Sequence, residues 1–268
     1  MTLLKSSAAR MPLMAAAVTL GVLLGFGTQA HEAQAARPDS TAANAQTEVA
    51  KALRLEAQST PLAARFSVTV VPPARGQDRN ERRAEWTFIR DARQIALLKG
   101  AIDEVWHRDE QGRVRFERVF HDDQRVVDYS TGELATLDVR VDWTALSTFI
   151  DPRELLPLKL VSVRGRGADA RVTLRGAVGG EMLVVEWMPA LQLPASLKRT
   201  GKDGAITRID LRQHTAVAPA SWPVPGARSP SYLRLDAADF GDMDYDPVVR
   251  KAEALDIRLG WRTAHQHD

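Results

Sequence analysis

Hydrophobic and polar residues follow two different periods along this chain. Apolar residues first recur at helical spacing from residue 44 onward, with Val49 and Leu53 on one side, and Pro61 ends this predicted helix. From Phe66, apolar and polar residues alternate in short runs separated by turn residues. Alternation places every second side chain on the same face of a strand, so the pattern predicts an antiparallel meander.

The middle and the end of the chain interrupt this meander with short helices. Asp142 and Asp151 can cap free backbone N–H groups where helices are expected to start, and the last helix is expected to start at Asp246. Residues 216–231 contain four prolines and form an irregular crossing segment. The expected helices after the first are residues 131–137, 143–150, 152–156 and the segment from 246. The expected strands are residues 66–70, 85–88, 94–99, 102–108, 113–121, 125–129, 158–164, 170–174, 181–188, 191–199 and 205–213.

The first thirty residues have the pattern of a secretory signal peptide. Lys5 and Arg10 form a charged start, residues 11–26 are apolar, and small residues allow cleavage after Ala30 or Ala35. A helix that spans a membrane needs about 20 apolar residues, which this run does not reach, so a cleaved signal is favoured over an anchor. We therefore expect a periplasmic protein with no stable transmembrane anchor after cleavage.

The expected organisation is a signal peptide at residues 1–30, a flexible leader at 31–43 and a single β-rich domain at 44–268 that ends in a helix. The whole chain has 36 basic and 34 acidic residues, and the signal holds two of the basic ones, so the mature chain has 34 of each. Nucleic-acid binding rests on excess basic charge, so a nucleic-acid partner is not expected.

The sequence lacks cysteine and several motifs on which catalytic and cofactor sites are often built. It contains no cysteine, which excludes cysteine nucleophiles, thiolate zinc sites and iron–sulfur clusters. Neither a nucleophile elbow, a zinc-protease motif, a phosphate-binding loop nor a dinucleotide fingerprint is present. We therefore predict no cofactor and no enzymatic activity.

One stretch, EVWHRDEQGRVRFERVFHDD at residues 104–123, concentrates histidines and acids among aromatic residues. The acids occupy two predicted turns, and alternation places the arginines on a solvated face. His107 and His121 flank different turns and can approach each other in a simple hairpin, which leaves open a metal pair or an acid–base pair. A metal site requires three or four ligands, however, and no further ligand visibly converges there. Two strands and their turns are therefore the favoured interpretation.

Other candidate metal ligands lie near the ends of the chain. The aspartates of the acidic segment lack the spacing of a calcium loop, so a solvated loop with a helix cap is favoured there. His265 and His267 belong to the C-terminal tail, and His31 would become the mature N-terminus after cleavage at Ala30. No metal site is predicted from these residues. The aspartates concerned are Asp236, Asp239, Asp242, Asp244 and Asp246.

The stretch LQLPASLKRT, followed by GKDG and AITRIDLRQH, is a strand with a proline, a turn and a return strand. Together with the order of the other elements, it resembles the half-barrel of periplasmic lipoprotein carriers and envelope-stress sensor domains. The resemblance implies a strongly curved antiparallel sheet whose concave apolar face is covered by helices. It also implies a site for a lipid, an acyl chain or a lipoprotein segment. Aromatic residues of suitable size for such a site are Trp86, Phe88, Trp106, Phe116 and Trp187.

Three functions therefore remain as hypotheses. The first is a non-enzymatic periplasmic carrier for a hydrophobic ligand, which an apolar cavity would favour. The second is a module that contacts another envelope protein through the sheet edge or the long proline-rich segment, which a filled core with an exposed apolar patch would favour. The third is a hydrolase that uses His107 and His121, which a cleft with converging histidine and acidic side chains would favour.

Overall fold

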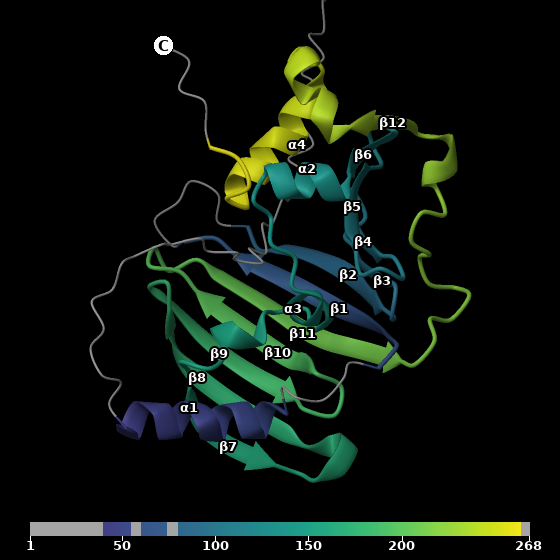
Figure 1. Cartoon of the computed structure of the whole chain (residues 1–268). Coiled ribbons are helices and arrows are strands. Elements are labelled where there is room, and N and C mark those ends of the chain that lie inside the picture. Colours follow the sequence, from purple (N-terminus) through teal and green to yellow (C-terminus); the bar gives the residue numbers. More distant parts are fainter. Residues whose placement is uncertain (1–39, 55–59, 74–79, 264–268) are drawn as a thin grey trace, which may run out of the picture.

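The computed structural model describes residues 40–54, 60–73 and 80–263 (Figure 1). The predicted signal peptide with both cleavage positions, His31 and the His265–His267 tail lie outside the described residues. One twelve-stranded sheet organises the described part of the chain, in the order β12-β6-β5-β4-β3-β2-β1-β11-β10-β9-β8-β7. All neighbouring strands are antiparallel except β12 and β6, which are parallel.

The strands are β1 (Leu62–Val71), β2 (Arg82–Arg90), β3 (Gln94–Leu98), β4 (Ile102–Arg108), β5 (Val114–Phe120), β6 (Arg125–Tyr129), β7 (Lys159–Arg164), β8 (Arg171–Val178), β9 (Glu181–Met188), β10 (Leu193–Thr200), β11 (Ile206–Thr215) and β12 (Leu233–Asp236). The α-helices are α1 (Ser40–Leu53), α2 (Thr131–Thr136), α3 (Trp143–Ser147) and α4 (Pro247–Arg258). Short 3-10 helices are η1 (Pro152–Glu154), η2 (Gly167–Asp169), η3 (Ser229–Ser231) and η4 (Ala237–Asp242).

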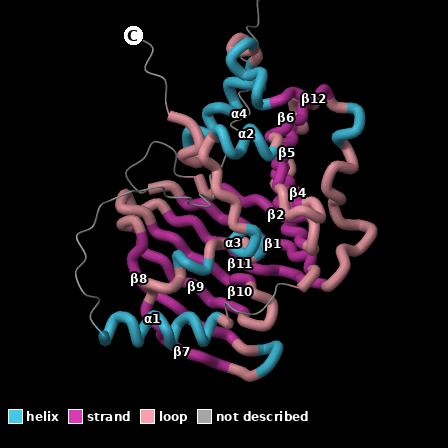
Figure 2. The backbone as a smooth tube through the Cα atoms, in the orientation of Figure 1, coloured by secondary structure: helices cyan, strands magenta, loops and turns pink. Residues whose placement is uncertain are grey.

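The sheet is open and strongly curved. In Figure 1 the strands from β12 to β4 are seen nearly edge-on, whereas β7 to β11 are seen face-on. Helices α2 and α4 lie against the first of these groups, α1 lies against the second, and α3 lies over the middle of the sheet, all on the inner side of the curve (Figure 2). The mainly β half-barrel with helices on its concave face is the architecture that the sequence predicts, and the prediction is confirmed.

The hydrophobic core lies between this concave face and the helices. One continuous cluster joins Leu53 of α1, Leu134 of α2 and Ala252 of α4 to inward side chains of both halves of the sheet. Short helices form on the sheet because their starts are capped locally: Asp142 accepts hydrogen bonds from the backbone N–H groups of Thr144 and Ala145. None of the helices in the described residues is both long and apolar enough to cross a membrane.

Several elements differ from the sequence-based expectation. The first helix begins at Ser40, ahead of the expected start at residue 44. Strand β12 was not expected, because four residues are too few to show a period. The helix expected at 143–150 ends at Ser147, since Phe149 adopts the left-handed backbone conformation with φ 68°. On the face expected to be solvated, Arg113 and Arg115 are exposed as predicted, but Glu117 on the same face is buried, at 8% exposure.

Candidate functional site

The aromatic residues expected to line a ligand site all belong to the buried cluster on the concave face. Trp86 and Phe88 lie on β2, at the middle of the sheet, and both are at most 3% exposed. Trp106 and Phe116 lie opposite each other on β4 and β5, with ring centroids 4.3 Å apart. Trp187 on β9 is fully buried, and its indole N–H donates to the carbonyl of Leu53 at the end of α1.

Phe149 covers the aromatic residues at the middle of the sheet. Its ring stacks on Phe66 at 4.4 Å and meets the edge of Phe88 at 5.5 Å, with Trp86 at 6.4 Å. It belongs to residues 143–156, which run from α3 through η1 across the concave face and are called the cover below. The side chains of the cover thus occupy the space where a ligand on the aromatic residues would lie.

Trp261, just after α4, covers the other aromatic group. Its ring lies 5.9 Å from Trp106, 5.5 Å from Phe116 and 5.9 Å from Tyr129, each in an edge-to-face arrangement. Aromatic pairs favour this geometry, which adds to the area that they bury. The two groups of rings are therefore closed by separate parts of the chain, one by the cover and one by the segment after α4.

Little free space remains beneath the cover. A cavity of about 30 Å³ lies between Phe88, Trp106, Leu146 and Phe149. One water molecule takes up about this volume in the liquid, whereas sites for small ligands have volumes of about 300–1,000 Å³. The space beneath Phe149 is therefore filled by side chains, and this cavity is too small for the acyl chain that the resemblance implies. Whether these aromatic side chains bind a ligand stays a prediction.

A larger cleft opens beside the cover, and it is called the seam cleft below. Its volume is about 530 Å³, and it lies between the chain that joins α2 to the cover and the end of α4. Apolar side chains of Val139, Val141 and Val178 line it together with Trp261, and Asp142 and Arg153 contribute charged groups. Because Trp261 contacts both the cleft and the rings of Trp106 and Phe116, the cleft borders the aromatic face.

Arg90 ties the cover to the rest of the protein from within the core. Its side chain is buried, at 2% exposure, at the end of β2. The guanidinium donates to the carbonyl of Ser147 in the cover at 2.6 Å, and to the carbonyls of Leu191 at 2.7 Å and Thr60 at 2.9 Å. Burial lowers the pKa of Arg90 to about 10, so it remains charged at neutral pH. All of these acceptors are backbone carbonyls.

A second buried charge network joins the sheet to α4. Arg118 and Asp256 are both fully buried, and Arg118 Nη1 lies 2.8 Å from Asp256 Oδ1. The Tyr129 hydroxyl donates to the same carboxylate. Burial by itself lowers the pKa of Arg118, but its electrostatic interactions with Tyr129 and with the carboxylates of Asp256 and Glu104 outweigh burial and raise that pKa, so the guanidinium stays charged. This network is absent from the sequence-based expectations, although Arg118 shares the parity of the apolar Phe116 and Phe120.

The histidines of the stretch at residues 104–123 are held apart. His107 pairs across the sheet with Arg115, whereas the backbone of His121 bonds to Ala101 at the other end of β4. Six residues separate these ends along β4, which at about 3.3 Å per residue is roughly 20 Å. The expectation that the two histidines can approach each other is therefore wrong, and the acid–base pair of the hydrolase hypothesis is not assembled.

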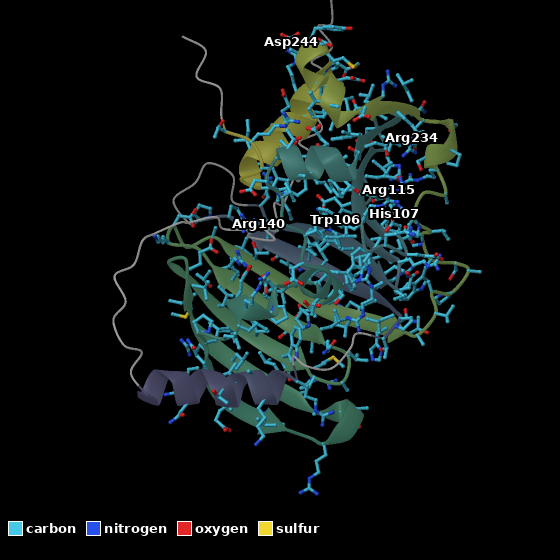
Figure 3. All side chains as sticks on the ribbon, viewed as in Figure 1. Trp106, His107, Arg115, Arg140, Arg234 and Asp244 are labelled. Atoms are coloured by element: carbon cyan, nitrogen blue, oxygen red, sulfur yellow. The ribbon has the colours of Figure 1, made fainter. Side chains whose placement is uncertain are left out.

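Each histidine contacts an acid of its own. His121 Nε2 lies 2.7 Å from Asp103 Oδ2, and its Nδ1 lies 3.2 Å from the Tyr232 hydroxyl. His107 lies beside Arg115 (Figure 3), with its Nε2 3.7 Å from Glu117 Oε1.

The charge of Glu117 depends on the basic side chains around it. Burial raises the pKa of Glu117, but His107, Arg115 and Arg234 outweigh burial and lower that pKa to about 2. Arg234 comes from β12, the strand that the sequence did not predict. A short edge strand thus supplies part of the charge that keeps this buried carboxylate ionised.

Among the described residues, no group of three or more histidines, aspartates or glutamates is placed to hold a metal ion. Asp236 and Asp246 cap the starts of η4 and α4, as their side chains accept hydrogen bonds from backbone N–H groups. Asp244, in the same acidic segment, lies far from His107 (Figure 3). Two of the five aspartates of the acidic segment therefore act as helix caps.

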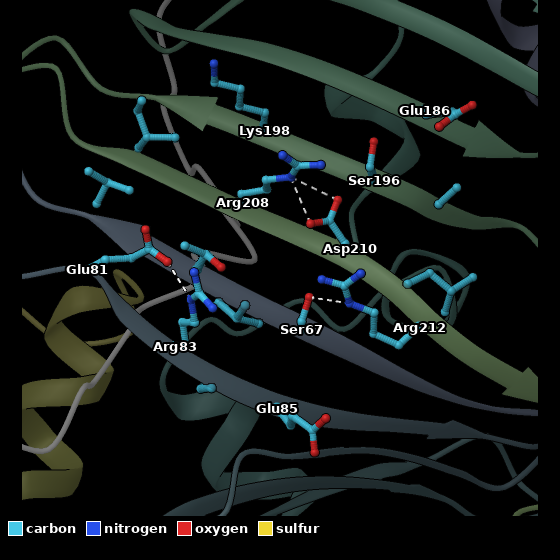
Figure 4. A pocket seen from close by; sticks show the side chains of 17 residues that line it. Ser67, Glu81, Arg83, Glu85, Glu186, Ser196, Lys198, Arg208, Asp210 and Arg212 are labelled. Atoms are coloured by element: carbon cyan, nitrogen blue, oxygen red, sulfur yellow. Dashed lines mark hydrogen bonds and ion pairs between the residues drawn. The ribbon is translucent and has the colours of Figure 1, made fainter.

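The convex face of the sheet carries a wide polar hollow of about 1,130 Å³ (Figure 4). It is lined by outward side chains of β1, β2, β9, β10 and β11, and its charges largely neutralise one another. Arg208 Nε lies 2.8 Å from Asp210, and Arg212 donates to the Ser67 hydroxyl at 2.8 Å. Such a face is typical of the solvated side of an antiparallel sheet.

No protein-family model matches the sequence, and no curated protein matches it. Solved structures with a similar arrangement include PNGF-II, with 10% identity and a TM-score of 0.38 over 70% of this chain and 34% of that chain. The chain thus spans about one third of the length of PNGF-II. A putative outer membrane lipoprotein-sorting protein domain from Vibrio parahaemolyticus has 8% identity and a TM-score of 0.32, over 69% of this chain and 96% of that chain. The Pseudomonas aeruginosa MucA/MucB complex matches with 13% identity and a TM-score of 0.31, over 70% and 68%. At these TM-scores the likenesses carry no argument about function.

Proposed function

We propose that this protein is a non-enzymatic binding protein of the periplasm that carries an acyl chain or a lipoprotein segment on the concave face of its sheet. The observation that carries the proposal is the attachment of the cover. A buried arginine, Arg90, holds a short helical segment over a wall of aromatic side chains by bonding to the Ser147 carbonyl. A cover held in this way can be released without unfolding the sheet beneath it.

The cover itself is built for displacement rather than for maximal stability. Helix α3 has only five residues, and helices this short have little stability of their own. Phe149 takes a left-handed conformation, which costs an L-residue about 1–2 kcal/mol. An apolar chain that replaces Phe149 against Phe66 and Phe88 would restore the lost ring contacts and relieve this strain.

The seam cleft supplies a way in. Its volume of about 530 Å³ falls within the range for small-ligand sites. Its lining is mixed: apolar side chains that can contact an acyl chain lie beside charged residues that can contact a polar head group. From the cleft, a ligand reaches Trp106 and Phe116 by displacing Trp261, and then Trp86 and Phe88 by displacing the cover. Trp187 lies further along the same apolar surface, beneath the end of α1.

The test uses a fluorescent acyl probe and the mature protein. We expect the probe to bind and to change tryptophan emission, and we expect lipids to co-purify with protein extracted from the periplasm when measured by mass spectrometry. Phe88→Asp should abolish probe binding, whereas the same change at Tyr245, which is 73% exposed, should not. Because a core aspartate can disrupt folding, Phe149→Ala serves as the second variant: it should tighten probe binding by vacating space beneath the cover. If Phe149→Ala folds and binds no probe, the proposal is wrong.

A further inference from the structure

Strand β7 forms one border of the sheet, and no other described element lies beyond it (Figure 1). Within the part of the chain that the structure describes, β7 pairs only with β8, so the backbone groups on its other side have no partner strand there. Helix α1 contacts β7 from the concave side (Figure 1). Val161 and Val163 are 56% and 57% exposed here, which is unusual for two β-branched residues so close together.

The border is also strongly basic. The hairpin of residues 159–178 contains five basic residues and one acid, Asp169, which gives a net charge of +4. Among the described residues, none of the five basic side chains forms an ion pair. Elsewhere many arginines are paired; Arg199 on β10, for example, contacts Glu154 and Glu181. The basic residues of the hairpin are Lys159, Arg164, Arg166, Arg171 and Arg175.

We propose that the free edge of β7 binds an extended acidic segment of another protein by strand addition. An unpaired edge offers alternating N–H and C=O groups that only a second peptide backbone matches along its length. Unpaired basic side chains select acidic residues in that segment, and the exposed valines favour apolar residues between them. The six residues of β7 offer roughly 20 Å of edge for this pairing.

The positive charge of the hairpin also disfavours pairing of the free edge of β7 with a second copy of this chain. Pairing β7 with β7 would bring two basic hairpins together, and like charges on neighbouring strands are unfavourable. The bulge between Leu160 and Ser162 further disfavours regular pairing between two identical edges. The edge is therefore protected against self-association while it remains open to an acidic partner. This surface is separate from the proposed acyl site, and neither proposal depends on the other.

The test measures binding of a fluorescein-labelled peptide of alternating glutamate and valine to the mature protein, by fluorescence anisotropy. A peptide with lysine in place of glutamate is the charge control. We expect the glutamate peptide to bind, the lysine peptide not to bind, and the backbone amides of β7 to gain protection from hydrogen exchange. Added salt should weaken binding, because exposed charges are screened beyond about 10 Å at 0.1 M.

Paired variants locate the site. Lys159→Glu with Arg164→Glu should weaken binding about tenfold, because two exposed attractive contacts become repulsive. Lys198→Glu with Arg258→Glu makes the same change in net charge at exposed positions away from β7 and should leave binding unchanged. All four positions are exposed, so folding should persist, and circular dichroism checks this. Equal losses in both double variants, protection outside β7, or displacement by a single-stranded DNA oligonucleotide would each overturn the proposal.

Discussion

Replacing Arg90 by methionine should release the cover while keeping most of the buried volume of the side chain. Three bonds to backbone carbonyls are 2.9 Å or shorter, but only the bond to Ser147 joins the cover to the sheet. A hydrogen bond to a charged group contributes about 1.5–3 kcal/mol, so the equilibrium between closed and open cover should shift by that amount. This corresponds to roughly a tenfold to hundredfold larger open population.

The loss of global stability should be of similar size, because two effects oppose each other. The three short bonds contribute about 5–9 kcal/mol together. Burial opposes them: it lowers the pKa of Arg90 from 12.5 to about 10, a penalty of about 3 kcal/mol on the charged form. We therefore expect the free energy of unfolding to fall by about 2–6 kcal/mol, measured by urea denaturation.

Affinity for an acyl probe shows whether Arg90 holds the cover closed, which we call the latch role, or is only an ordinary core contact. Where the closed state dominates, affinity is reduced by the fraction of molecules that are open, so Arg90→Met should bind the probe about 10 to 100 times more tightly. Arg212→Met, which removes a side-chain hydrogen bond on the convex face, is the control and should bind like the wild type. If Arg90→Met is folded and binds the probe no more tightly than this control, the latch reasoning is refuted.

Three further predictions concern the buried charges. Asp256→Asn leaves Arg118 buried without its carboxylate and should lower the free energy of unfolding by about 3–5 kcal/mol, whereas the double variant Arg118→Met with Asp256→Leu should recover most of that loss in urea denaturation. Since the pKa of Glu117 is about 2 in the folded state against 4.5 ordinarily, its stabilisation is present above pH 4.5 and is lost as the pH falls toward 2. The wild type should therefore lose up to about 3 kcal/mol relative to Glu117→Gln across that window, and parallel acid titrations of both proteins would contradict this. His121→Gln should cost about 1–2 kcal/mol through its bond to a buried carboxylate, and His107→Gln less than about 0.5 kcal/mol; equal effects in thermal denaturation would argue against the different environments of the two histidines.

Strands and helix starts were predictable because their signals are local. The run that ends at Tyr129 and the run from Glu181 to Met188 are short apolar runs between turn residues, and they form β6 and β9 within the predicted bounds. Asp142 and Asp151 cap α3 and η1 as predicted, since a cap depends only on the next few backbone N–H groups. Strand β12 escaped prediction because it exists only through its parallel pairing with β6, more than one hundred residues away.

Part of the candidate site was likewise predictable from the sequence, and part was not. The positions of Trp86 and Phe88 two residues apart determine that both face one side of β2. Their spacing does not show which segment of the chain covers these two side chains. The sequence expected helices over the sheet, but the left-handed backbone of Phe149 and its stacking on Phe66 follow from how the cover crosses the concave face.

The sequence by itself determined most of the elements, their order, the mainly β class and, where a strand alternates, its apolar face, because these depend on neighbours within a few residues. Only the tertiary structure decided which polar groups become buried partners. Arg118 meets Asp256 across 138 residues of sequence, and Arg90 meets Leu191 across 101. When its partner is unknown, a charged residue within an apolar run is expected to be exposed to solvent. The curvature of the sheet brings these distant groups into one interior, where an unpaired charge is too unfavourable to persist, and so only the folded chain reveals what each of them binds.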